Sequence, residues 1–188
     1  MKKRIPILLT LLALLLTLAA CTEKPADPAD PGTTPNAAQS EADDEFANGY
    51  TVKLDDGTSI TLGAVADDTL AALGTANDIM EAPSCIRAGV DRVYTYNGRF
   101  TLTTQPDAEG RERITEIVFL SDAVAITENG ASVMLGGDAS AADTAFGEPY
   151  ESSGGINRYL ADKTLSGIVN VTVDGGEITA LSVNYVFG

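Results

Sequence analysis

The sequence contains no histidine, so the side chains that could do chemistry are mainly two cysteine thiols and 27 carboxylates, and catalysis by carboxylates alone or by a lysine stays open in principle. Without histidine there is no Ser-His or Cys-His dyad, and the commonest general base and zinc ligand are missing. Cys21 follows a short apolar run, and Cys85 has no disulfide partner other than Cys21. The sequence therefore favours a modification of one thiol and predicts no catalytic residue.

The apolar run before Cys21 predicts a signal peptide. Three basic residues at positions 2–4 precede the run, which extends from Ile5 to Leu18. Because a membrane span needs about 20 apolar residues, this shorter run is typical of a secretory leader. Its end, Leu18-Ala19-Ala20-Cys21, resembles the lipobox of bacterial lipoproteins. The resemblance implies cleavage after residue 20 and attachment of a diacylglyceryl lipid to Cys21, which palmitate labelling would detect; a secreted protein with a chance cysteine is the alternative.

A lipid on Cys21 would place the protein on the extracytoplasmic side of the cell membrane. Two acyl chains bind a bilayer stably, whereas one is marginal. Residues 1–20 contain three basic residues and no acid, so their removal changes the formal net charge from −15 to −18. Such a charge repels phosphate backbones, and we expect no nucleic-acid partner. The expected partners are the membrane, through the anchor, and an envelope protein or a wall ligand.

The many acidic residues do not predict a metal site. Asp55-Asp56 and Asp67-Asp68 are pairs, but the sequence has no calcium-binding loop with regularly spaced oxygen ligands and a distal glutamate. We expect no metal and no cofactor apart from the lipid on Cys21. Cys85 lies in the apolar segment Ala82-Pro83-Ser84-Cys85-Ile86. It is interpreted as a small buried side chain, with a reactive thiol as the alternative.

Composition divides the remaining chain into a linker and a folded domain. Residues 22–48 contain four prolines and seven acids against one lysine. This composition disfavours a packed core, so residues 21–48 are expected to be a disordered linker that holds the domain away from the membrane. Residues 49–188 have the length of one ordinary domain.

An internal repeat predicts the architecture of that domain. Residues 56–63 align without gaps on residues 129–136, and Gly74 aligns on Gly147 at the same offset of 73. We expect two repeats, about 50–122 and 123–188, each a strand–helix–strand–strand–strand unit. About 70 residues bury little surface alone, so the two units are expected to share one antiparallel sheet with short helices on one face. The predicted fold class is α+β.

The repeat resembles two known families. Phe146-Gly147-Glu148-Pro149, at the end of the second expected helix, is similar to the helix end of SmpA/OmlA lipoproteins, and the tandem arrangement is similar to β-lactamase-inhibitor-like proteins. Members of these families mainly bind proteins, so the resemblance implies a binding role for this chain. No site residue beyond the lipid-bearing cysteine is carried over from them.

A hairpin around Asn97-Gly98 supplies the candidate binding residues. A type I′ turn there would pair Tyr96 with Arg99. This register places Val93, Thr95, Phe100 and Leu102 toward the core and Arg92, Tyr94, Tyr96, Arg99 and Thr101 on the other face. Tyrosine and arginine dominate many protein contacts. Arg92, Tyr94, Tyr96 and Arg99 are therefore predicted to form a docking patch, with an ordinary solvated sheet face as the alternative.

These observations favour a non-catalytic binding module that acts through an open sheet face. An enzyme or enzyme accessory that acts on wall polymers through carboxylates is the alternative. A structural spacer or a solute-binding component is a third possibility, although solute-binding proteins are usually larger.

Overall fold

Buried and half-exposed residues alternate along most of the described chain, which is the pattern of a β-sheet with one face on a core. Phe100–Pro106 is the clearest case, since every second side chain from Phe100 onward is buried. The computed structural model describes residues 49–161 and 166–185. The expected signal peptide over 1–20, the candidate lipid-attachment residue Cys21 and the linker over 21–48 lie outside these residues.

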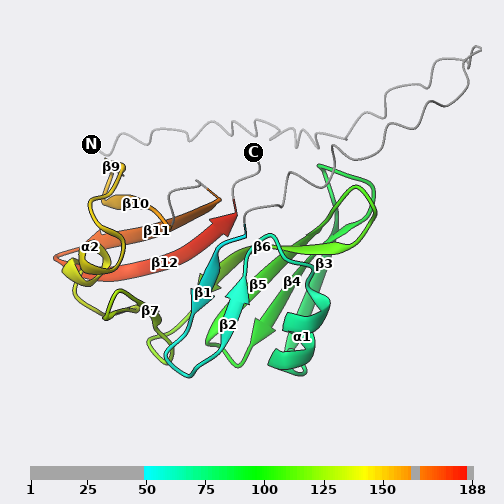
Figure 1. Cartoon of the computed structure of the whole chain (residues 1–188), viewed down its shortest axis with the longest axis horizontal. Coiled ribbons are helices and arrows are strands. Elements are labelled where there is room, and N and C mark those ends of the chain that lie inside the picture. The colour runs from blue at the N-terminus through cyan, green and yellow to red at the C-terminus, as the bar shows by residue number, and fades with distance from the viewer. Residues whose placement is uncertain (1–48, 162–165, 186–188) are drawn as a thin grey trace, which may run out of the picture. The chain divides into compact units, whose positions relative to one another are not determined.

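Eight strands form one antiparallel sheet in the order β3-β4-β5-β6-β12-β11-β10-β9 (Figure 1). The order is symmetric about the central strands β6 and β12, which pair only over residues 116–118 and 182–184. The bounds of these strands are β3 (Asp78–Pro83), β4 (Val90–Tyr96), β5 (Phe100–Pro106), β6 (Glu112–Phe119), β9 (Glu151–Ser153), β10 (Ile156–Leu160), β11 (Gly167–Asp174) and β12 (Glu177–Tyr185).

Two short hairpins and two short helices complete the described elements. The hairpins are β1 (Thr51–Lys53) with β2 (Ser59–Thr61), and β7 (Ile126–Glu128) with β8 (Ala131–Val133). The helices are α1 (Asp67–Leu73) and α2 (Ser140–Phe146). In residues 49–161 and 166–185, no helix has the length and apolar character needed to cross a membrane.

The hydrophobic core lies between one face of the large sheet and the two hairpins. Val52 and Ile60 of the first hairpin and Ile126 and Val133 of the second are fully buried in the same cluster as the inward side chains of the sheet. The hairpins also contact each other, because a bridge joins Leu54 to Ile126. The two hairpins therefore cover the sheet on one side.

The segments that follow the hairpins join the sheet directly. Gly63 N donates to Ile114 O at 2.7 Å, and Gly136 N donates to Ile178 O at 2.8 Å. These hydrogen bonds use backbone groups of β6 and β12 beyond the short stretch over which the two strands pair with each other. Gly63 has a φ of +80°, and a Cβ there would lie 2.8 Å from the ring of Tyr185. Glycine is required at this position because the backbone approaches that ring so closely.

The predicted α+β fold class, with tandem strand–helix–strand–strand–strand units and short helices on one face, is wrong. The described residues form twelve strands and only two helices, each seven residues long. A hairpin stands where one strand was expected before each helix, and four strands follow each helix where three were expected. Turns at Gly57 and at Asn129-Gly130, all with positive φ, reverse the chain within the segments taken as single strands.

The helices contribute little to the covering layer. α1 contains no buried residue, and α2 buries only Ala142 and Ala145. A helix that covers a sheet normally presents a broad apolar stripe to it. The cover is therefore mainly made of β-hairpins, which explains why a fold with helices on one face does not form.

Candidate functional site

The predicted turn at Asn97-Gly98 is present, but the strand register beyond it differs from the prediction. Both residues have positive φ, +49° and +64°, and Arg99 N donates to Tyr96 O at 2.8 Å. Phe100, not Arg99, then pairs with Tyr96. Two residues thus oppose Tyr96, and Arg99 is the additional residue of a bulge. Because side chains alternate along a strand, this shift by one residue exchanges the two faces of β5 relative to β4.

The prediction that Arg92, Tyr94, Tyr96 and Arg99 form one exposed face is therefore wrong. Tyr94 and Tyr96 are only 9% and 5% exposed and belong to the core. They face inward with Phe100. The opposite face of this hairpin carries other side chains, among them Thr101, which was correctly predicted to face outward.

Arg92 and Tyr94 meet at Glu112 on the covered side of the sheet. The Tyr94 hydroxyl donates to Glu112 Oε2 at 2.8 Å, and the Thr104 hydroxyl donates to the same atom at 2.8 Å. Arg92 forms an ion pair with Glu112 and a second one with Glu81. Burial, together with the hydrogen bond to Glu112, raises the pKa of Tyr94 to about 12. This cluster stabilises the fold and offers no open surface around Tyr94.

Arg99 connects the β4–β5 turn to the β1–β2 turn. Its guanidinium forms an ion pair with Asp56 and lies 5.8 Å from the centre of the Phe100 ring. The hydrogen bond from Arg99, followed by that from Thr58 N, lowers the pKa of Asp56 to about 2. Arg99 therefore links the β1–β2 hairpin to the large sheet.

The other side of the sheet is half-exposed and has an unusual composition. We call it the open face and define it by ten outward residues in the middle of five neighbouring strands: Val93, Thr95, Thr101, Thr103, Glu116, Val118, Ile168, Asn170, Ser182 and Asn184. None of the ten is buried, so no described residue covers them as the hairpins cover the core. Glu116 is the one charged residue among these ten, and other charged side chains on this face, such as Asp91 and Arg113, lie nearer the ends of their strands. Depletion of charge is a property of the centres of protein interfaces.

Hydrogen bonds join the polar side chains in the middle of the open face. Asn184 Nδ2 donates to Glu116 Oε1 at 2.8 Å, and Asn170 Nδ2 donates to Asn184 Oδ1 at 2.8 Å. The Thr103 hydroxyl donates to the other oxygen of Glu116 at 3.3 Å, and the Ser182 hydroxyl donates to Asn184 Oδ1 at 3.2 Å. This ladder crosses four strands and holds the polar groups in fixed positions. A preorganised surface loses less conformational entropy when it binds a partner.

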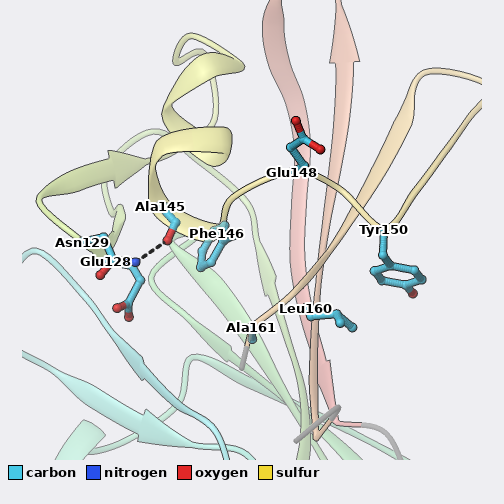
Figure 2. Close-up of a pocket in the computed structure, with 8 residues that line it drawn as sticks. All are labelled: Glu128, Asn129, Ala145, Phe146, Glu148, Tyr150, Leu160 and Ala161. Carbon is cyan, nitrogen blue, oxygen red and sulfur yellow. Dashed lines mark hydrogen bonds between the residues drawn. The ribbon is translucent and has the colours of Figure 1, made fainter. Parts of the chain in front are cut away.

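A cleft with a volume of about 510 Å³ lies at the end of α2 (Figure 2). Asn129 fixes one wall, because its Nδ2 donates to Ala145 O at 2.7 Å. Phe146, Leu160 and Ala161 supply apolar surface, and Glu128, Glu148 and Tyr150 supply polar groups. The carboxyl groups of Glu128 and Glu148 point in different directions in Figure 2. Because acid–base catalysis by two carboxylates needs both groups at one bond, Glu128 and Glu148 are not arranged as a catalytic pair in this cleft.

Other candidate groups are also placed by the structure. Cys85 is exposed, so its interpretation as a buried small side chain is wrong. It lies in the loop between two outer strands of the sheet, where no core forms around it. No cluster of three or more acidic or cysteine side chains able to hold a metal ion occurs in the part of the chain that the structure describes. Cys21 lies outside that part.

The chain matches no family model, no curated protein and no solved structure. The resemblance to lipoproteins, to β-lactamase-inhibitor-like proteins and to the SmpA/OmlA family thus stays a prediction from sequence. Function must be inferred from the surfaces of the domain itself.

Proposed function

We propose that the chain is a lipid-anchored cell-envelope protein that acts as a non-catalytic binding module through the open face of its large sheet. The anchor would be the lipid on Cys21, and the linker over 21–48 would allow the domain to reach its partner. The partner would be an envelope protein or a wall ligand. The observation that carries the proposal is the open face, a half-exposed surface whose ten central residues include one charged and three apolar side chains.

The composition of the open face supports binding better than simple solvation. A solvated sheet face in an acidic protein would be expected to carry many charges, because charge keeps such a surface soluble. Here threonine, asparagine and serine side chains alternate with Val93, Val118 and Ile168. Such a surface supplies both hydrogen-bonding groups and apolar contact to a partner.

A single substitution can test this surface without disturbing the core. Thr101 is half-exposed on β5, opposite Val118, so Thr101→Arg places a long charged side chain on the open face. Thr144→Arg introduces the same residue at an exposed position of α2 and is the matched control. We expect Thr101→Arg to lose the specific partner captured from detergent-solubilised envelope, whereas Thr144→Arg retains it. Equal capture by both variants, at unchanged thermal midpoints, would refute a binding role for the open face.

The anchor has its own test. Palmitate labelling of the full chain in cells should disappear when Cys21 is replaced by alanine. Labelling that persists in the Cys21→Ala variant would mean a different attachment site, and a chain free in the culture medium would refute the anchor.

A further inference from the structure

Strand β3 (Asp78–Pro83) is an unprotected edge of the large sheet. It has a neighbour on only one side, and all six of its residues are exposed. Ile79 and Met80 are 50% and 61% exposed, and Ile86 in the following loop is 60% exposed. These are three of the six large apolar side chains that are exposed in the described residues. The other edge, β9, is three residues long and contains no apolar residue.

Long, exposed apolar edges are rare, because their unpaired backbone groups can recruit another strand. The register shows which groups of β3 are available. Ser84 N donates to Gly89 O at 3.1 Å, and this pair continues the β3–β4 register. Because hydrogen-bonded and non-hydrogen-bonded pairs alternate in an antiparallel ladder, residues 78, 80 and 82 bond to β4. Ile79 and Glu81 therefore direct their N–H and C=O groups away from the sheet.

Pro83 supports this assignment independently. Proline has no N–H, so within a sheet it is tolerated where its nitrogen faces away from the neighbouring strand. Pro83 has the same parity as Ile79 and Glu81, so it sits at an outward position and leaves the ladder with β4 intact. The edge thus offers an ordered row of donors and acceptors that ends at Pro83.

A small hollow adjoins the same edge. Its volume is about 250 Å³, and Glu81, Ala82, Pro83 and Val90 line it. Glu81 Oε1 accepts a hydrogen bond from Arg92 Nε at 2.7 Å, while 56% of the Glu81 side chain is exposed. The apolar walls suit the methylene stem of a long side chain, and the carboxylate suits a terminal cation. Strand addition uses this combination of backbone hydrogen bonds and side-chain pockets.

We propose that β3 is a docking edge, to which an extended segment of a partner protein with alternating apolar and basic residues adds as a ninth strand. Charge complementarity selects a basic segment, because β3 contains no basic residue and the exposed Glu81 lies on the face that alternate basic side chains of the segment would share. A second copy of this chain fits less well, since β3 contains two acidic residues and no basic one, so two copies would bring like charge to the shared edge. This surface lies outside the open face, so it goes beyond the function proposed above and can fail independently of it.

The test measures fluorescence anisotropy of a labelled hexapeptide of alternating lysine and valine. The protein is the full lipidated chain in detergent micelles, with empty micelles as the blank. We expect specific binding that falls at least ~10-fold for a peptide with glutamate in place of lysine. N-methylation of every second peptide amide should reduce binding by at least a similar factor, because it removes the donors to β3.

Ile79→Pro is the decisive protein variant. It removes an outward N–H without removing a bond to β4, so the fold should persist while peptide binding falls about tenfold. Ser152→Pro on β9 is the matched control and should leave binding unchanged. If Ile79→Pro lowers the thermal midpoint, Glu81→Lys replaces it and should invert the preference between the lysine and glutamate peptides.

Three results would overturn the proposal. One is equal binding by wild type and a folded Ile79→Pro variant. Another is equal affinity for the lysine and glutamate peptides. The third is self-association of the wild-type chain in analytical ultracentrifugation that Ile79→Pro abolishes, because this would assign the edge to a second copy.

Discussion

Glu112 and Glu116 lie on the same strand, β6, but face opposite sides of the sheet. A bulge lies between them, where the pairing shifts from Thr103↔Glu116 to Thr104↔Ile114. The bulge inserts one extra residue and so reverses the alternation of side chains, which is why two glutamates four residues apart face opposite sides. Glu112 accepts hydrogen bonds on the covered side, and Glu116 does so on the open face. Replacing each by alanine therefore compares the two faces with one and the same substitution.

The cost of Glu112→Ala follows from the groups that lose their acceptor. The hydroxyls of Tyr94 and Thr104 both donate to Glu112 Oε2, and both residues are buried. Each buried donor left without a partner costs about 1–3 kcal/mol. The Arg92 side chain is 30% exposed and keeps its ion pair with Glu81. The loss of the ion pair between Arg92 and Glu112 therefore adds less than about 1 kcal/mol. We expect a loss of about 3 kcal/mol in the free energy of unfolding.

The cost of Glu116→Ala should be much smaller. Its partners Thr103 and Asn184 are half-exposed, so water can replace the lost acceptor. We expect a loss below about 1 kcal/mol. Urea denaturation of both variants at neutral pH measures the difference. Equal losses, or a larger loss for Glu116→Ala, would refute the assignment of covered and open faces.

Three further predictions concern pH and packing. The pKa of Asp56 is lowered to about 2 by its hydrogen bond from Arg99, so the contribution of Asp56 to stability is complete above pH 4 and falls as pH drops from 4 toward 2. Asp56→Asn should reduce the acid loss of stability in pH-dependent urea titrations, and the part that comes from Asp107 should remain. Burial, aided by a hydrogen bond to α2, raises the pKa of Tyr159 to about 12, so the contribution of Tyr159 to stability should be complete below pH 10 and fall between pH 10 and 12. Tyr159→Phe should reduce the alkaline loss of stability, and the part that comes from Tyr94 should remain. Gly63→Ala should cost more than about 1 kcal/mol, because the new Cβ would meet the Tyr185 ring at a positive φ; an unchanged thermal midpoint would contradict the packing described.

Local rules predicted the Asn97-Gly98 turn, because asparagine and glycine are the residues that readily adopt positive φ in succession. They could not predict the bulge at Arg99. At the bulge Arg99 contacts the ring of Phe100 and forms an ion pair with Asp56, which is 43 residues away in sequence, and local rules do not include such a distant contact. One unforeseen residue was enough to exchange the two faces and to move Tyr94 into the core.

The fold class was missed for a related reason. Asp56-Gly57 and Asn129-Gly130 are turn signals, but the alignment of the two segments that begin with them favoured single strands. Hairpins with three-residue strands form there because they bury Ile60 and Val133 against the large sheet. Such tertiary burial leaves only a weak local pattern. The alternation of side chains along each strand predicts that the sheet has an outward face. Which residues lie on that face depends on the strand registers, and the sequence alone did not determine those registers.

Site-specific photocrosslinking in living cells tests the central claim most directly. A photoreactive phenylalanine analogue placed at Thr101 or Ile168 reports on the open face, and the same residue at Lys53 or Thr144 reports on exposed positions of the covering elements. The account predicts a discrete crosslinked product from the two open-face positions and none from the two control positions. Crosslinks of equal yield at all four positions, or none from the open face, would contradict it.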